Sequence, residues 1–97
     1  MKFFIAVYHH PDEEGWKQHL EAHVAYLERL LKDGTLRASG PLVDTPVRSA
    51  MLILTTETRE HALAVIEEDP FTAHGLVADL TITEWNPIFG TYRDECC

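Results

Sequence analysis

Hydrophobic and polar positions follow two different periods along the chain, and each change of period marks a new element. Residues 2–8 are apolar on both alternating faces, which is typical of a strand covered on both sides. Residues 12–33 carry apolar side chains every three or four positions, the spacing of an amphipathic helix. Asp12 can cap the start of this helix, and Gly34 provides a stop at its end. The first third of the chain is therefore predicted to be a strand followed by a long helix.

The rest of the chain is predicted to add three strands and one helix. Thr58 can cap the second helix, and Asp69-Pro70 ends it because the residue before a proline avoids the helical conformation. The resulting order is that of the ferredoxin-like α+β fold, with an antiparallel four-stranded sheet and two helices on one face. The first and third strands are the most apolar, so we expect them in the middle of a sheet of order 4-1-3-2. The later elements are predicted at residues 35–42 (strand), 49–55 (strand), 59–68 (helix) and 77–85 (strand), before an irregular tail over about 86–97.

The second face of this sheet is predicted to be covered by another protein surface. Two helices can cover only one face, and a face open to water should make each strand alternate between apolar and polar residues. The first strand does not alternate, and in the third strand Met51 and Ile53 are as apolar as Leu52. The simplest cover is the same face of a second copy. We therefore predict a homodimer packed sheet to sheet, with Trp85 in the interface.

Composition and charge are those of an ordinary globular protein and argue against several functional classes. The 97 residues, 45% hydrophobic and 25% charged, suit one domain spanning residues 1–97. A net charge of −8 disfavours binding to nucleic acid, and no apolar run approaches the roughly 20 residues that span a bilayer. The apolar N-terminus is interrupted at His9-His10-Pro11 without a cleavage site, so we expect a cytoplasmic protein. Cys96-Cys97 close no loop, and we assign them no role.

His23 and Asp69 offer the most specific chemical hypothesis in the sequence. His23 falls inside the apolar stripe of the long helix, and an imidazole with an ordinary pKa of about 6.5 can exchange a proton near neutrality. Asp69 follows Glu67 and Glu68 at the negative end of the second helix, where each anion costs a few tenths to about 1 kcal/mol. An imidazolium partner would offset that cost. We therefore predict a dyad in which Asp69 fixes the tautomer of His23, and His23 moves a substrate proton.

Each member of this pair also has a structural interpretation. A buried neutral histidine with one satisfied ring nitrogen is an ordinary core residue. Asp69 before Pro70, with Gly75 a few residues later, has the residues of an N-capped helical turn. The two interpretations of Asp69 are compatible because a carboxylate has two oxygens, one for backbone N–H groups and one for an imidazole.

Further residues are expected beside the same pocket as substrate-binding candidates. Ser39-Gly40 end the second predicted strand, where glycine lets a ligand approach the backbone, although an ordinary strand end before Pro41 fits equally well. Tyr8 could supply a hydroxyl group to the cleft or simply pack in the core, and His74 is expected at the pocket rim. Three other histidines are expected on the surface: His9, His10 and His61.

No metal site and no cofactor are predicted. His19 and His23 are four residues apart on one helix, a spacing that can bind a metal. However, Leu20 stands where a zinc-binding HExxH motif would have its glutamate, and no further ligand can be placed. The sequence contains no phosphate-binding loop, flavin motif or dinucleotide fingerprint, so we expect cofactor-free chemistry.

Three segments of the chain stand out by their order and spacing: His23-Val24-Ala25-Tyr26-Leu27 with Gly34 eleven residues after the histidine, Ala38-Ser39-Gly40-Pro41-Leu42, and Asp69-Pro70-Phe71-Thr72-Ala73-His74-Gly75-Leu76. Together they resemble the YCII-related (YciI-like) family, and the resemblance extends over nearly the whole chain. It implies the dimeric α/β-barrel form of the ferredoxin-like fold, with a histidine–aspartate pair in a pocket of each protomer. By motif position these would be His23 and Asp69. At least one member of this mostly uncharacterised family resembles enzymes that eliminate chloride from aromatic-degradation intermediates.

Two functions follow from these observations. The first is an enzyme that uses the His23–Asp69 dyad for acid–base chemistry, as an isomerase or a dehydrochlorinase-like lyase, on a small organic acid or an aromatic-derived metabolite. The second is a non-catalytic homodimer, ligand-binding or stress-associated, in which the pair is a structural hydrogen bond. In both cases the expected partners are a second copy of the chain and a small molecule.

Overall fold

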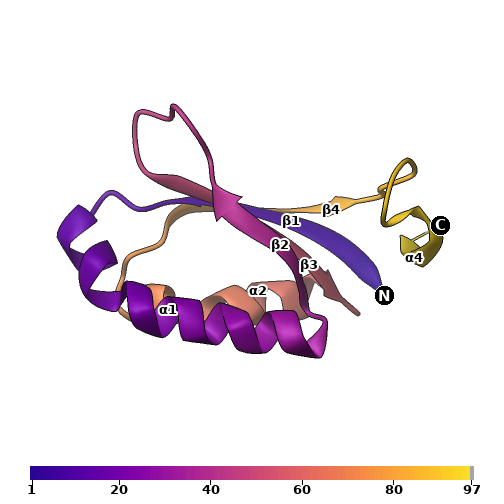
Figure 1. Ribbon diagram of the computed structural model, residues 1–97, viewed down its shortest axis with the longest axis horizontal. Helices are drawn as coiled ribbons and strands as arrows, with labels where there is room; N and C mark the ends of the chain where they lie inside the picture. The colour runs from indigo at the N-terminus through magenta and orange to yellow at the C-terminus, as the bar shows by residue number, and fades with distance from the viewer. Residues whose placement is uncertain (97) are drawn as a thin grey trace.

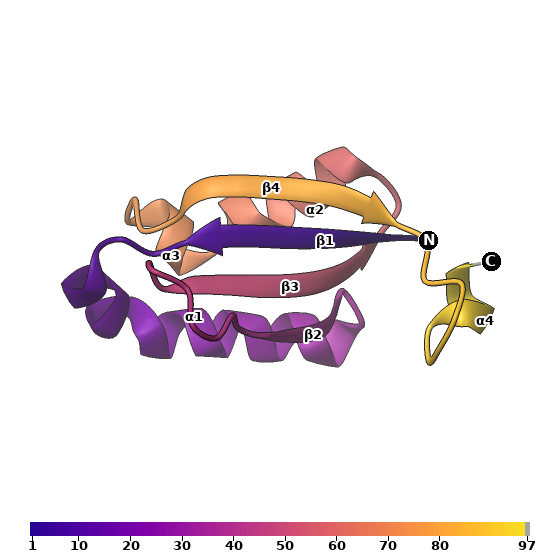
Figure 2. The ribbon, with the colours of Figure 1, turned by 90° about the horizontal axis from the view of Figure 1, so that it is seen from above.

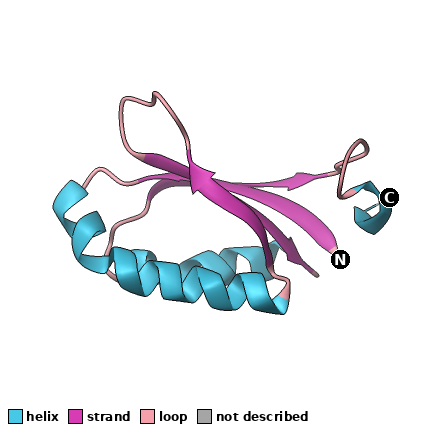
Figure 3. Ribbon diagram, viewed as in Figure 1, coloured by secondary structure: helices cyan, strands magenta, loops and turns pink. Residues whose placement is uncertain are grey.

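Four strands form one antiparallel sheet with the helices packed on a single face. The computed structural model describes residues 1–96, and its strand order is β2-β3-β1-β4, which confirms the predicted ferredoxin-like α+β fold. Figures 1 and 3 show α1 and α2 beneath the sheet and no helix above it. The elements are β1 (Lys2–His9), α1 (Glu13–Asp33), β2 (Leu36–Pro41), β3 (Ser49–Thr56), α2 (Arg59–Glu67), α3 (Pro70–Ala73), β4 (Ala78–Trp85) and α4 (Arg93–Cys96).

Local capping interactions set the ends of α1. The Asp12 side chain accepts a hydrogen bond from the Gly15 backbone N–H at 3.0 Å. At the other end Gly34 has φ +89°, a left-handed conformation that favours glycine, and its N–H donates to Leu31 O. Within residues 1–96 no helix, α1 included, is both long and apolar enough to cross a membrane.

A close approach at Gly15 brings the loop before β4 against the start of α1. A Cβ atom at this position would lie 2.4 Å from Cδ2 of Leu76, well inside van der Waals contact. A larger residue at position 15 would therefore require the side chains of Leu76 and Asp12 to shift, and the loop that carries Leu76 helps to build the site described below.

The hydrophobic core lies between the sheet and its helices. Strand period two brings Phe4, Ala6 and Tyr8 of β1 to the helix side, where they join the inward faces of the other elements. Phe4 pairs with Leu54 of β3, so neighbouring strands present matching apolar residues to the helices. The other core residues are Tyr26, Leu30, Leu36, Leu52, Ala62, Val65, Ile66 and Ile82.

The opposite face of the sheet is apolar and only half buried within one chain. Ile5 pairs with Ile53 and Val7 with Met51, and all four side chains point away from the helices. Figure 2 shows the sheet from above, with the C-terminal segment beside the N-terminal end of β1 and outside the sheet itself.

Within the tail predicted to be irregular, α4 forms a single helical turn, and Tyr92 just before it covers one corner of this face. The Tyr92 ring lies 5.1 Å from that of Phe3, which is 1% exposed, and Trp85 packs edge-on against both rings. Trp85, predicted in the dimer interface, therefore also has partners within its own chain. Of the terminal cysteine pair, Cys97 lies outside the described residues.

Candidate active site

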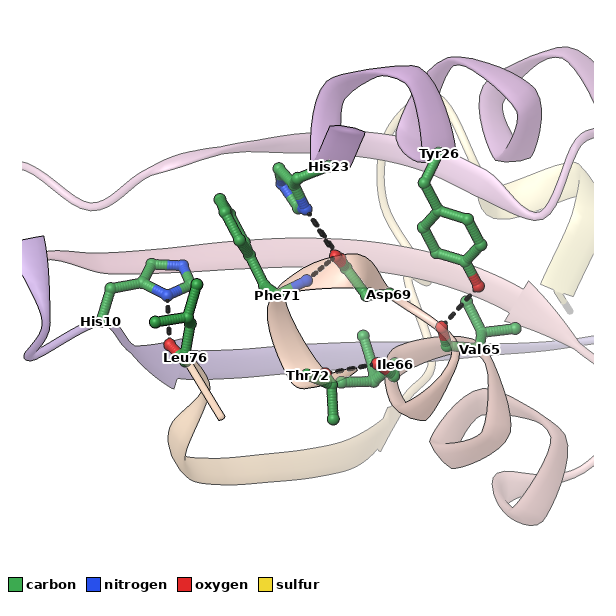
Figure 4. Close-up of polar contacts among 9 residues, drawn as sticks. All are labelled: His10, His23, Tyr26, Val65, Ile66, Asp69, Phe71, Thr72 and Leu76. Atoms are coloured by element: carbon green, nitrogen blue, oxygen red, sulfur yellow. Dashed lines mark hydrogen bonds and ion pairs between the residues drawn. The ribbon is translucent and has the colours of Figure 1, made fainter. Parts of the chain in front are cut away.

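His23 of α1 and Asp69, the residue before α3, form a buried hydrogen-bonded pair. The Nδ1 atom of His23 lies 2.7 Å from Oδ2 of Asp69 and 2.9 Å from Oδ1 (Figure 4). The two side chains are 10% and 1% exposed. An ionised carboxylate can only accept hydrogen bonds, so Nδ1 carries the hydrogen and Nε2 of the neutral ring keeps its lone pair. The contact therefore fixes the tautomer of His23 and leaves Nε2 for another partner.

Asp69 has a second task as the N-cap of α3. It adopts an extended conformation, and its Oδ1 accepts the backbone N–H of Phe71 at 2.9 Å, while Pro70 occupies the first turn. The same carboxylate thus holds a backbone amide and an imidazole, as the two compatible interpretations of the sequence require. Its burial is accounted for by partners on both oxygens.

Two side-chain hydrogen bonds tie α1 and α3 to α2 beside this pair. Tyr26, one turn after His23, donates from its hydroxyl to Val65 O at 2.6 Å, and Thr72 donates to Ile66 O at 2.6 Å (Figure 4). Burial raises the pKa of Tyr26 to about 12, with a smaller contribution from nearby carboxylates, so this phenol stays a donor. The bonds hold the backbones that carry His23 and Asp69 at a fixed separation.

Phe71 packs flat against the His23 imidazole. The ring centroids are 4.0 Å apart with 15° between the planes, and Phe71 is 1% exposed. The other side of the phenyl group meets the edge of His10, with centroids 4.8 Å apart. Phe71 belongs to the third family-like segment, but nothing in the sequence pattern indicated that it would stand between two imidazoles.

His10 is buried at 3% exposure, so its prediction as a surface residue is wrong. Its Nδ1 lies 2.7 Å from Leu76 O, and burial lowers the pKa of His10 below its ordinary value, only partly opposed by that hydrogen bond. The strand period contained the missed signal: positions 4, 6, 8 and 10 share one side, and the first three face the helices. His9 is also partly buried, whereas His61 is exposed as predicted.

A cavity of about 340 Å³ lies beside the two imidazoles, a size at the lower end for small-molecule sites. His10, His23 and Phe71 form one part of its wall, and apolar side chains of α1 form another. Ser39 and Gly40 of β2 line it too, so the structure brings these two predicted residues together with His23. The apolar lining from α1 comprises Trp16, Leu20, Val24 and Leu27.

Two other predicted site residues lie elsewhere. Tyr8 is 1% exposed in the core, its hydroxyl has no hydrogen-bond partner within residues 1–96, and burial raises its pKa. His74 is exposed and stacks on His19, with ring centroids 3.7 Å apart. Neither Tyr8 nor His74 contributes to the cavity wall. Within the described chain, no group of three or more histidine, cysteine, aspartate or glutamate residues could hold a metal ion.

Arg48, a further residue that sequence reasoning missed, adds a permanent positive charge to the cavity wall. Its guanidinium lies 3.8 Å from the centre of the Trp16 ring, and its Nε donates to Oε2 of Glu13 at 2.6 Å. That hydrogen bond lowers the pKa of Glu13. The Arg48 carbonyl also accepts the backbone N–H of His10 at 2.7 Å, which keeps both residues at the same end of the cavity.

Three solved structures share the fold of this chain. One is a 5-chloro-2-hydroxyhydroquinone dehydrochlorinase of Burkholderia phenoliruptrix in complex with 2,5-dihydroxybenzoquinone, at 24% identity and a TM-score of 0.70, covering 84% of this chain and 92% of that one. Another is a Bacteroides thetaiotaomicron protein of unknown function, described as a possible oxidoreductase, at 19% identity and 0.52, covering 86% and 96%. A third, from Arabidopsis thaliana, has 12% identity and a TM-score of 0.52, covering 94% and 99%. At these identities the likeness shows the fold alone.

Sequence comparison identifies the family. No curated protein sequence matches the chain. The model of the YCII-related domain matches residues 1–86, which include β1 to β4 and every residue that lines the cavity. The chain therefore belongs to the YCII-related domain family.

Proposed function

We propose that this protein is a cytoplasmic, cofactor-independent enzyme that uses His23 and Asp69 for acid–base chemistry, as an isomerase or a lyase. The substrate is a small organic acid or an aromatic-derived metabolite. One observation carries the proposal: the hydrogen bond to Asp69 occupies Nδ1 of His23 and leaves Nε2 of this cavity-lining residue for a substrate in a cavity of ligand size.

In the proposed reaction, Nε2 of His23 takes a proton from the substrate. Asp69 keeps the ring in the required tautomer and stabilises the imidazolium that forms. The electron pair stays on the substrate as an enolate, and the Arg48 guanidinium is placed to stabilise its oxygen or to bind a carboxylate. Return of the proton at another carbon completes an isomerisation. Departure of a neighbouring chloride with its bonding electrons completes an elimination, with the proton left on His23.

Chlorinated hydroxyhydroquinones are the first compounds to test as substrates. The Burkholderia phenoliruptrix protein with this fold is a dehydrochlorinase of such a compound. Its activity matches the lyase form of the proposed reaction, which needs a base and a water-poor, largely apolar cavity. Trp16, Leu20 and Leu27 provide apolar walls of that kind here.

The proposal can be tested with a panel of candidate substrates. Proton NMR in D₂O would follow deuterium incorporation into small keto acids, lactones and hydroxylated aromatics, with chloride release measured for 5-chloro-2-hydroxyhydroquinone. Wild-type protein should label or dechlorinate at least one compound, while His23→Ala and Asp69→Asn should not. Equal activity in either variant would contradict the dyad mechanism.

The second candidate is a non-catalytic ligand-binding or stress-associated homodimer. The double use of the Asp69 carboxylate favours it, because a helix cap and a buried hydrogen bond already offset the cost of burying that group. A thermal-shift screen with small acids and phenols would distinguish the two functions. Ligand stabilisation without product in wild type, and a lower melting temperature in His23→Gln, would favour this alternative.

We also propose that the protein is a homodimer in which the open sheet faces of two chains pack together. The half-buried side chains of Ile5, Val7, Met51 and Ile53 support this, since burying them would remove apolar surface from water.

A further inference from the structure

We propose that His10 is a second ligand-contacting residue of the cavity, which accepts a hydrogen bond from a ligand hydroxyl through Nε2 and thereby selects hydroxylated substrates. This inference rests on the function proposed above because it concerns the same cavity. It adds a residue from outside the His23–Asp69 pair and narrows the substrate class.

Two hydrogen bonds hold His10 at the cavity wall. Its backbone N–H donates to Arg48 O at 2.7 Å, and its ring bonds to Leu76 O at 2.7 Å. The Leu76 segment is held by the backbone hydrogen bond from Leu76 N–H to Phe71 O at 2.8 Å. The Phe71 ring packs against the imidazole, with 64° between the planes. The ring therefore has one orientation, set by backbone contacts to two different segments.

The contact with Leu76 decides which nitrogen of His10 faces the ligand. A carbonyl oxygen only accepts hydrogen bonds, so Nδ1 is the protonated nitrogen and Nε2 is an acceptor. No hydrogen bond to Nε2 exists within residues 1–96, yet this atom is not sealed away like the Tyr8 hydroxyl. Figure 4 shows the ring with Nδ1 on Leu76 and its other nitrogen turned toward the side where Phe71 and His23 lie.

Burial favours the neutral form of His10, which is the form that accepts a hydrogen bond. Burial lowers the pKa of His10 most, and the electrostatic interactions with His23 and Arg48 lower it further. The Leu76 carbonyl and the negative charge of Asp69 act in the opposite direction but are outweighed. At neutral pH the ring therefore presents a lone pair to the cavity.

The two imidazoles of the cavity consequently have different roles. Both donate through Nδ1 and both present Nε2, but His23 is backed by a carboxylate and His10 by a neutral carbonyl. A positive charge is stabilised only on His23, which suits proton transfer, while His10 suits hydrogen-bond acceptance. A ligand without a hydrogen-bond donor would bury the lone pair of His10 Nε2 without a partner, which costs binding free energy. Because of this cost, the site should reject analogues that lack the hydroxyl group.

Size-matched ligand pairs test this role, together with one variant that keeps the hydrogen bond made by Nδ1 and removes Nε2. Dissociation constants would be measured by NMR titration for each benzenediol and for the fluorophenol with the same substitution pattern, which loses one O–H donor. The variant is His10→Asn, whose amide nitrogen replaces Nδ1 and keeps the bond to Leu76 O while removing Nε2. Urea unfolding would establish that the variant is folded.

Wild-type protein should bind at least one diol more tightly than its fluorophenol by roughly 2- to 10-fold, the contribution of one hydrogen bond. His10→Asn should abolish that preference. In ¹⁵N-histidine spectra of the wild type, His10 Nε2 should be the unprotonated nitrogen and should shift on addition of the diol.

Three results would overturn the role of His10: no diol preference in wild type, an unchanged preference in folded His10→Asn, or a protonated Nε2 in the free protein. Catalysis is scored separately by the effect of His23→Ala on deuterium incorporation. An inert protein that still selects diols would defeat the proposed enzyme alone, and an active protein without the preference would defeat the His10 inference alone.

Discussion

Phe71 stacks on the His23 imidazole while its own backbone N–H donates to the Asp69 carboxylate that binds His23. One residue therefore fixes both members of the pair. Phe71→Leu keeps the backbone hydrogen bond and an apolar side chain but loses the aromatic contact, worth about 0.5–1.5 kcal/mol beyond its buried area. We expect at least that loss in the free energy of unfolding, together with reduced turnover. Urea denaturation and the deuterium-incorporation assay would measure the two effects. Unchanged stability would contradict the importance of the stack.

Asp69 variants can separate its capping role from its charge. Asp69→Asn keeps an oxygen for the Phe71 N–H, whereas Asp69→Ala removes the cap and leaves Nδ1 of His23 without a partner. Loss of the cap alone should cost about 0.5–2 kcal/mol, so the alanine variant should be clearly the less stable in urea unfolding. Both variants should lose turnover by roughly 10²- to 10⁴-fold, the usual contribution of acid–base catalysis. Equal stabilities would show that Asp69 does not cap α3.

Tyr8 has a buried hydroxyl group with no hydrogen-bond partner in the described chain. Removing an unsatisfied buried polar atom relieves its desolvation penalty, which is about 1–3 kcal/mol. Tyr8→Phe should therefore raise the free energy of unfolding, or at least leave it unchanged, and should not affect ligand binding. Chemical denaturation of the two proteins provides the measurement, with Tyr26→Phe as the matched control. Tyr26 donates to Val65 O, so its substitution should destabilise the protein.

The lowered pKa of His10 predicts a dependence of stability on pH. In the unfolded chain His10 binds a proton below about pH 6.5, whereas the folded protein resists protonation there. The contribution of neutral His10 to the free energy of unfolding should thus be complete above about pH 7. The free energy of unfolding should fall as the pH is lowered toward about 5. His10→Asn removes this titration, so its stability should fall less over the same range. Parallel curves for both proteins in urea titrations would exclude the effect.

The homodimer can be tested at the centre of the open sheet face. Val7→Lys and Ile53→Lys place a charge among the half-buried apolar residues there. Each should shift the protein from dimer to monomer in sedimentation velocity at micromolar concentration, because a buried unpaired charge opposes association. Ala25→Lys, on the exposed side of α1, is the matched control and should leave the assembly unchanged. A wild-type monomer under these conditions would contradict the dimer itself.

Local sequence determined the elements and their order because the signals for them are short-ranged. Short continuous apolar runs mark β1 and β3, and a period near 3.6 marks α1. The helix ends were also predictable, since Asp12, Gly34 and Asp69 cap through neighbours within a few residues. The order of the elements, together with the apolar character of the two middle strands, predicted the observed sheet order.

The sequence by itself also indicated His23 and Asp69, but tertiary structure decided what surrounds them. The two residues are 46 positions apart, and only the packing of α1 on α3 brings them to 2.7 Å. The ring of His10 hydrogen-bonds to Leu76 O, 66 positions away in the sequence. Because His10 lies in the loop that follows β1, we predicted it on the surface, whereas this distant contact buries it. Phe71 and Arg48 have no distinguishing local pattern at all. Their roles arise from side-chain contacts between distant segments, and periodicity and capping describe only the neighbours of a residue along the chain.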